Sequence, residues 1–131
     1  MLWGLVPPWH HGAVATTHKL TTNNARLEGL RDSKLYKPVL EKDRRCVIVC
    51  DGFYEWKTKA GEKQPYLVYA AQKNPLFENV QEFSKASISQ HWSEEDGDSG
   101  PRPLFMAGLY SIWQPDDDKK KLVFNYTVIT R

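Results

Sequence analysis

Glu55 is the residue whose type and surroundings best suit acid–base chemistry. It lies within the aromatic run Phe53–Trp56, on an element whose other side chains favour a buried environment. A carboxylate shielded from water has a raised pKa, and this suits it to proton transfer near neutral pH. Two non-catalytic interpretations stay open: Glu55 could point to solvent from an edge strand, or it could pair with Arg44 or Arg45.

A second group of residues could bind a nucleic acid. Asn24 stands two residues before Arg26 and offers amide hydrogen bonds beside a cation, which would suit a phosphate or a sugar. Trp9 follows Pro7-Pro8 and is expected to be exposed, with a face on which a nucleobase could stack. Trp3 is expected in the core. Residues 19–45 hold eight Lys and Arg against four Asp and Glu, so either a polyanion partner or a solvated mixed surface fits them.

The cysteines and histidines favour structural roles. Cys46 and Cys50 in one strand would lie roughly 13 Å apart, too far for a disulfide, and their spacing does not match a zinc knuckle. We expect buried core thiols. His10, His11 and His18 have no nearby carboxylate at the spacing of metal ligands. We therefore expect surface histidines and no metal site.

Short strands must position these residues. The run 46–50 predicts a buried strand, 53–69 a hairpin, and 104–113 and 122–130 two further strands around a loop at 115–120. Residues 10–26 predict a loop, and 27–42 a weak helical pattern broken by Pro38. Residues 72–103 change character and predict a long insertion, part-helical at 77–86.

Length and composition limit the class of protein. A chain of 131 residues with 40% hydrophobic content and net charge +2 fits a single folded domain. No apolar run approaches the ~20 residues of a membrane span, and the first residues do not read as a signal peptide. Two cysteines without a signal favour a reducing, intracellular compartment.

Seven segments together resemble one family. In order they are Trp3–Trp9, Asn24 with Arg26, Arg44–Val47, Asp51–Trp56, Gln64–Tyr66, Met106–Leu109 and Tyr126–Thr130. This ordered set resembles the SOS-response-associated peptidase (SRAP) family over almost the whole chain outside 72–103. The resemblance implies an α+β, strand-rich domain built on a distorted β-barrel. Residues 1–131 would be the central part of that domain, incomplete here, because both ends look cut.

The resemblance also implies an activity. Family members shield abasic sites in single-stranded DNA: a cysteine at the second residue attacks the ring-opened sugar and closes to a thiazolidine crosslink, and the same machinery serves self-cleavage. By this resemblance Asn24 would hold the sugar or amine and Glu55 would shuttle a proton. Arg26 would contact a phosphate, Trp9 would stack on a base, and Lys37 keeps part of a basic contact. No cofactor, membrane or second copy is implied, and the location would be nuclear.

The chain departs from the family at its nucleophile. Residue 2 is Leu2, and the His-x-Arg-Met-Pro motif that carries the family's histidine is absent from the 131 residues. Neither Cys46 nor Cys50 has a free α-amine, so we expect this polypeptide to form no crosslink. Two alternatives therefore stay open: a non-enzymatic module that binds single-stranded DNA, and a fragment without function.

Overall fold

The computed structural model describes residues 1–59, 61–71 and 102–131, and the chain falls into two compact units. The sheet unit comprises Met1–Ile48 and Met106–Arg131. The hairpin unit comprises Val49–Phe105. The predicted helix at 77–86 and nearly all of the predicted insertion at 72–103 lie outside the described residues.

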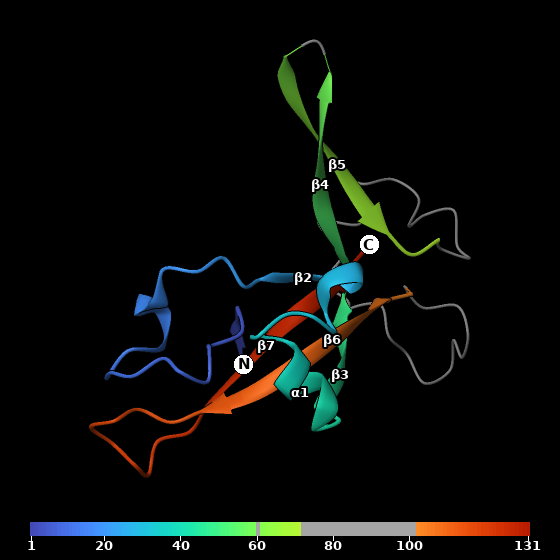
Figure 1. Ribbon diagram of the computed structural model, residues 1–131. Coiled ribbons are helices and arrows are strands. Elements are labelled where there is room, and N and C mark those ends of the chain that lie inside the picture. The colour runs from blue at the N-terminus through green and yellow to red at the C-terminus, as the bar shows by residue number, and fades with distance from the viewer. Residues whose placement is uncertain (60, 72–101) are drawn as a thin grey trace, which may run out of the picture. The chain divides into compact units, whose positions relative to one another are not determined.

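A mixed five-stranded sheet forms the centre of the sheet unit. The strands are β1 (Leu2–Trp3), β2 (Asn24–Arg26), β3 (Arg45–Cys50), β6 (Leu104–Trp113) and β7 (Val123–Thr130). Their order is β1-β7-β6-β3, and β2 also pairs with β7. The antiparallel β6 and β7 run side by side (Figure 1), with Tyr110 opposite Tyr126.

The two shortest strands share one edge of β7. β1 places Leu2 and Trp3 opposite Asn125 and Tyr126, and β2 places residues 24–26 opposite 128–130, both in parallel. Backbone bonds join the sheet edge between them, from Gly4 N to Tyr126 O at 2.8 Å and from Val128 N to Asn23 O at 2.9 Å. Together β1 and β2 act as one interrupted edge strand.

Three short helical segments complete the sheet unit: η1 (Ala15–His18), η2 (Leu27–Gly29) and α1 (Lys37–Glu41). Pro38 does not break a helix here, because it lies in the first turn of α1, where a missing N–H costs nothing. Its α1 neighbour Val39 packs into a core with Leu5, Ala25, Leu30, Leu35 and Leu109.

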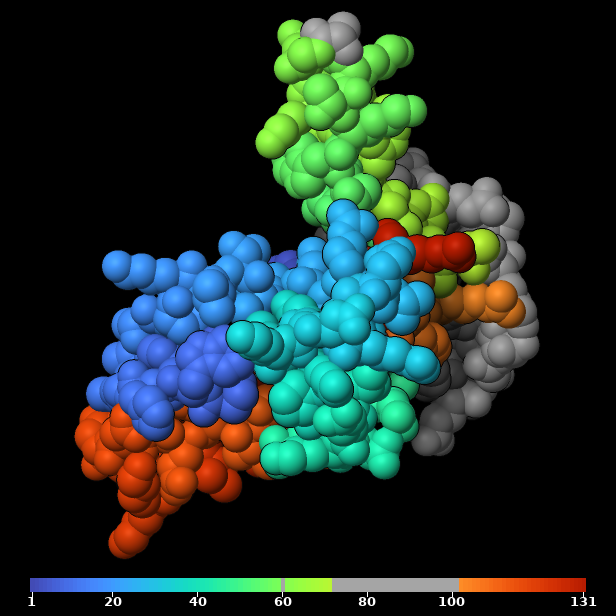
Figure 2. Space-filling model, in the orientation of Figure 1, coloured from blue at the N-terminus to red at the C-terminus, as the bar shows by residue number. Residues whose placement is uncertain are grey.

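A buried amide ties the N-terminal segment to the sheet. Asn125 is fully buried; its Oδ1 accepts from Val6 N at 2.9 Å and its Nδ2 donates to Val123 O at 3.0 Å. A smaller core forms nearby from Val6, Ala15 and Trp113. Gly12 N donates to Asp116 Oδ2, and Asp116 N donates to Gly12 O at 3.0 Å. Figure 2 shows the blue N-terminal residues lying against the orange β6–β7 loop.

The hairpin unit contains β4 (Gly52–Lys59) and β5 (Glu62–Tyr69), which pair over eight positions. Every β4 side chain from Phe53 to Lys59 is exposed. Gly61, with a φ of 85°, lies in the turn between the strands. The predicted hairpin at 53–69 is confirmed, but its aromatic residues do not form a core.

The strand-rich α+β fold that the sequence predicts is confirmed. Among the described residues the main sheet is open rather than closed into a barrel. The loop predicted at 10–26 contains both η1 and β2. The core position predicted for Trp3 is wrong: its side chain is 55% exposed, because β1 lies at the sheet edge.

Candidate nucleic-acid interface

β2 presents two candidate residues on the same face of the sheet. Successive side chains of a strand point to opposite faces. Ala25 is fully buried in the core, while Asn24 and Arg26 on either side of it are exposed. The strand therefore holds the amide and the guanidinium side by side, directed away from the core.

Trp3 belongs to the same face. The partners of Trp3, Asn24 and Arg26 on β7 are Tyr126, Val128 and Thr130, which alternate along that strand. The three exposed side chains therefore follow one another about 6.6 Å apart along the edge of β7. Sequence reasoning missed Trp3 as a site residue, since the pairing of β1 with a strand so distant in the chain has no local signal.

Hydrogen bonds fix the backbone around this edge. Trp3 Nε1 donates to Asn23 O at 3.1 Å, and Asn23 Nδ2 donates to Trp3 O at 3.1 Å. The hydroxyl of Tyr36 donates to Asn24 O at 3.3 Å. Burial raises the pKa of Tyr36, against a smaller lowering by the hydroxyl of Thr127, so the phenol stays protonated as a donor. The edge is thus held from two sides.

Arg26 is partly engaged and partly free. Its Nη1 donates to Arg131 O at 3.0 Å, while its side chain remains exposed. A guanidinium has five N–H donors in a planar fork, so one bond to a carbonyl leaves others for a phosphate. The contact fixes the direction in which the guanidinium points.

Trp9 and Lys37 are exposed in the sheet unit, as expected. Trp9 lies in a turn that His10 N closes onto Pro7 O at 3.0 Å, and its ring is 52% exposed. Lys37 begins α1, directly after the residue that contacts Asn24, and its Nζ lies 3.9 Å from Glu41 Oε1. An exposed pair of this kind contributes little to stability and leaves the lysine able to change partners.

Glu55 lies in the hairpin unit, opposite Tyr66 in the β4–β5 register. Within the hairpin unit Glu55 is exposed, so β4 and β5 alone do not supply the burial that the sequence predicts. Arg45, one of the two partners that the sequence left open for Glu55, has a carboxylate partner within the sheet unit, because its Nη1 lies 2.8 Å from Asp43 Oδ1. The fold therefore places Asn24 and Glu55 on separate units.

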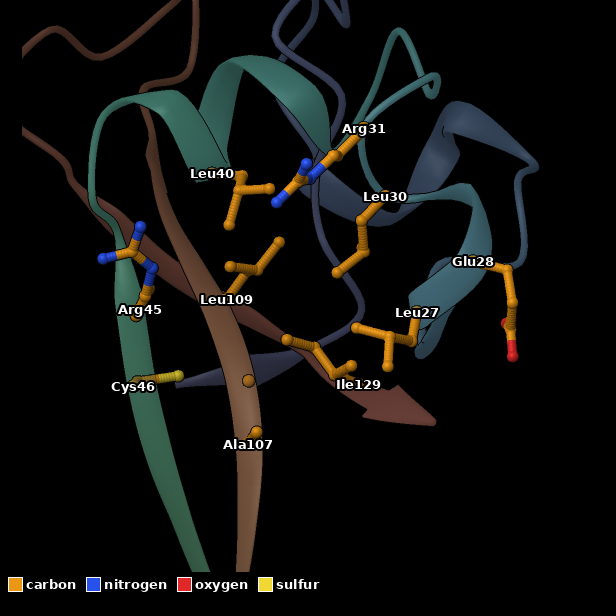
Figure 3. A pocket seen from close by; sticks show the side chains of 11 residues that line it. Leu27, Glu28, Leu30, Arg31, Leu40, Arg45, Cys46, Ala107, Leu109 and Ile129 are labelled. Carbon is orange, nitrogen blue, oxygen red and sulfur yellow. The ribbon is translucent and has the colours of Figure 1, made fainter. Parts of the chain in front are cut away.

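Cys46 borders an apolar cavity of about 320 Å³ in the sheet unit. Figure 3 shows its thiol together with Leu40, Leu109 and Ile129 along the cavity wall. Burial raises the pKa of Cys46, which keeps it a thiol and a poor nucleophile. Both cysteines are free and half-buried, rather than fully buried as expected.

His10 and His18 make packing contacts. The His10 ring stacks on Trp113 with centroids 5.5 Å apart, and its Nε2 bonds to Val14 O at 2.9 Å. Burial and the nearby His10 lower the pKa of His18. Within residues 1–59, 61–71 and 102–131 no group of three potential ligands could hold a metal ion. No helix in this part of the chain has the length and apolar character to cross a membrane.

Comparisons with known proteins agree on one family. The family model for SOS response associated peptidase (SRAP) matches residues 1–131. The chain is 36% identical to the "Abasic site processing protein HMCES" of Xenopus tropicalis over 134 residues, which is 99% of this chain and 35% of that protein. It is 32% identical over 77 residues to the "Abasic site processing protein YedK" of Escherichia coli, covering 59% of this chain and 31% of that protein.

A solved structure supports the same fold. A crystal structure of a protein from Bordetella bronchiseptica superposes with a TM-score of 0.64 at 23% identity, over 97% of this chain and 46% of that one. The chain spans about a third of the length of the HMCES relatives that it matches, with 35% in the Xenopus and 35% in the chicken protein.

Proposed function

Because the chain belongs to the SOS response associated peptidase family, we propose that it binds single-stranded DNA containing abasic sites. Relatives from frog, chicken and bacteria carry the name abasic site processing protein, which supports this substrate. The observation that carries the proposal is the exposed row of Trp3, Asn24 and Arg26 along one edge of β7.

The row combines the three contacts that a damaged single strand needs. An indole offers a stacking face to a base, independent of sequence. The guanidinium of Arg26 binds a backbone phosphate, while the amide of Asn24 donates to and accepts from the hydroxyl groups of the open sugar. Trp9 and Lys37, which are also exposed on the sheet unit, would add a second aromatic ring and a second cation.

The covalent step needs a nucleophile at residue 2. In a family member with cysteine at residue 2, its amine and thiol would condense with the sugar aldehyde to a thiazolidine and release the aldehyde oxygen as water, with the residue that matches Glu55 shuttling the proton. The same groups would serve the self-processing peptidase activity. Leu2 has no thiol, so we expect these 131 residues to bind without crosslinking. A band shifted by an abasic oligonucleotide on a denaturing gel would contradict this.

Binding is tested by fluorescence anisotropy with matched oligonucleotides, one intact and one with a central abasic site. We expect tighter binding of the abasic strand. Trp3→Ala should cost about 1–3 kcal/mol, the usual value of one stacked base. Arg26→Gln should reduce the slope of log K against log salt by about 0.7, as expected for one lost phosphate contact.

Lys34→Gln is the matched control. It removes the same charge from an exposed position of the sheet unit, outside the row. If Lys34→Gln and Arg26→Gln change the slope equally, the row is not the binding surface. Equal affinity for the two strands would leave only a non-enzymatic module that binds any single strand.

A protein that acts on genomic DNA works inside the cell. By family resemblance we propose a nuclear location and a monomer. Fractionation of cells that express a tagged form tests the location, and light scattering tests the oligomeric state.

A further inference from the structure

A second, polar cavity of the sheet unit lies where the end of β6 runs into the β6–β7 loop. Its volume is about 350 Å³, and three segments line it: the loop of Pro8, His10 and His11, the turn of Lys42 and Arg44, and the end of β6 with the loop that follows. The residues from that last segment are Ser111, Ile112, Trp113, Gln114 and Asp116. None of these residues belongs to the row of Trp3, Asn24 and Arg26.

The turn after α1 directs Lys42 and Arg44 away from the ion pair of Asp43 and Arg45. Asp43 has a φ of 53°, a left-handed conformation that reverses the chain between Lys42 and Arg44. Its carboxylate pairs with Arg45 at 2.8 Å. Lys42 and Arg44 line the cavity instead, and neither has an ion-pair partner within the described parts of the chain.

The one carboxylate that lines the cavity is already occupied. Asp116 Oδ2 accepts from Gly12 N at 2.6 Å and lies 3.6 Å from His11 Nδ1, while Oδ1 lies 3.5 Å from Lys119 Nζ. These donors offset its charge, so the unpaired charge that borders the cavity is positive. Such a concave site attracts and concentrates anions.

The wall behind the two cations is rigid. The Trp113 ring stacks on His10, and its Nε1 donates to His10 O at 2.9 Å. Backbone bonds from Arg44 N to Val39 O at 3.2 Å and from Tyr110 N to Arg44 O at 3.0 Å hold the turn against α1 and β6. The site is therefore formed before any ligand binds.

We propose that this cavity binds a phosphate group, with Arg44 contacting two of its oxygens and Lys42 adding a point charge. A guanidinium fork matches the geometry of phosphate, and an ammonium binds it without a directional requirement. The ligand is either free phosphate or a phosphodiester of the DNA strand. The second source rests on the proposed function, whereas the first does not.

The position of the cavity defines what a DNA strand must span. β2 and β3 are three strand spacings apart in the sheet, about 14 Å, and Ile112 lies about 13 Å along β6 from the level of Asn24 and about 7 Å from the level of Trp3. A strand held at Trp3 and Arg26 would reach the cavity only with its flanking nucleotides. The cavity would then set a minimum length for tight binding.

The first experiment uses inorganic phosphate and the intact 131-residue chain. NMR signals of the Trp113 indole N–H and of the ring of His11, both at the cavity, should shift and saturate as phosphate is added. Lys42→Gln/Arg44→Gln should abolish the saturable shift, and the charge-conserving Lys42→Arg, which leaves Arg44 in place, should retain it. Loss of the shift in the charge-conserving variant, or its persistence in the Gln variant, would overturn the proposal. Thermal unfolding of both variants shows that they fold.

The second experiment separates the two sources with a long and a short abasic oligonucleotide. For a phosphodiester, Lys42→Gln/Arg44→Gln reduces the salt slope for the long strand by about 0.7 to 1.4 and leaves the short strand unchanged. The matched control, Arg31→Gln/Lys34→Gln, removes the same charge elsewhere on the sheet unit. It should change the salt slope by the same amount for the long and the short strand.

The phosphate titration and the salt slopes together distinguish a free-phosphate site, a phosphodiester site and no site. Saturable phosphate binding with unchanged slopes assigns the cavity to free phosphate. Saturable phosphate binding by a chain that binds no oligonucleotide at all refutes the proposed function but keeps the phosphate site. Absence of phosphate binding together with unchanged slopes overturns the inference.

Discussion

The sheet unit and the hairpin unit both contain long antiparallel strands, but among the described residues β6 and β7 carry buried side chains and β4 and β5 carry none. Leu109 on β6 and Asn125 and Thr127 on β7 are fully buried, and Leu109 packs with Leu30, Leu35 and Val39 while Asn125 bonds to the N-terminal segment. On β4, Tyr54 and Trp56 are 63% and 59% exposed. Complete pairing of eight positions is therefore compatible with almost no core, and a hairpin of this kind has little stability of its own.

The difference also separates two kinds of candidate site residue. Asn24 and Arg26 flank a buried alanine on a strand that hydrogen bonds hold from both sides. Glu55 lies on a strand whose flanking side chains are exposed. Asn24 and Arg26, which would only bind the ligand, need a rigid strand to hold them in position. A proton shuttle also needs surroundings that adjust its acidity, and β4 and β5 alone do not supply them.

The largest expected effect is on the core of the sheet unit. Leu109→Ala should lower the free energy of unfolding by about 2–5 kcal/mol, because it leaves a cavity beneath α1. Val68→Ala in β5 should change it by about 0.5 kcal/mol or less, since that side chain is partly exposed. Urea unfolding followed by circular dichroism measures both, and equal effects would contradict the contrast between the units.

A matched pair of glycines gives the next effect. A Cβ at Gly108 would lie 2.5 Å from Ile48 Cδ1 and 2.8 Å from Thr127 O, and a Cβ at Gly52 would lie 2.6 Å from Val68 O. Gly108→Ala should destabilise the sheet unit by about 1–3 kcal/mol. Gly52→Ala should increase amide exchange only in β4 and β5. Hydrogen exchange distinguishes them, and global loss of protection in Gly52→Ala would show that the units unfold together.

A smaller effect compares the two catalytic candidates. Asn24→Ala should weaken binding of an abasic strand by about 1 kcal/mol, since it removes hydrogen bonds to the ligand. Glu55→Gln should leave non-covalent affinity unchanged, because a proton shuttle acts only in the covalent step. Anisotropy titrations measure both, and a Glu55→Gln variant that binds as weakly as Asn24→Ala would assign Glu55 to the binding surface.

The smallest effect concerns acid stability of the sheet unit. Hydrogen bonding to Gly12 N, followed by contacts with Lys119 and His11, holds the pKa of Asp116 below its usual value of 3.8. The unfolded chain therefore takes up the proton first, so Asp116 stabilises the fold above that pH and loses this contribution as pH falls through the lower folded pKa. Melting curves between about pH 5 and about pH 2 should show a smaller drop for Asp116→Asn than for wild type. An identical drop in melting temperature for the two proteins would mean that the hydrogen bond from Gly12 N to Asp116 does not stabilise the fold.

Local patterns predicted the contiguous strands. The run 104–113 becomes β6 with the same bounds, and 53–69 becomes β4 and β5, because alternation and turn glycines act between neighbours in sequence. The SRAP family and the strand-rich α+β class are likewise confirmed.

Contacts between distant segments could not be predicted in this way. The parallel docking of residues 2–3 and 24–26 on β7 leaves no local pattern, and it decides that Trp3 is exposed and that Asn24 lies in a strand. The separation of Lys42 and Arg44 from the Asp43–Arg45 pair depends on one left-handed residue, so the charge run alone could not reveal the polar cavity.

The shared edge of β1 and β2 also determines the order in which the molecule can assemble. β6 and β7 form a local hairpin, but Val6 and Asn125, whose hydrogen bond secures the β1 side, are separated by 119 residues. The entropy of closing so long a loop must be lost before these contacts form. The surface that carries Trp3, Asn24 and Arg26 should therefore be completed last, and the high contact order indicates folding on a scale of roughly milliseconds to seconds. A nascent chain would acquire the surface that we propose for nucleic-acid binding only after β7 has been synthesised and paired.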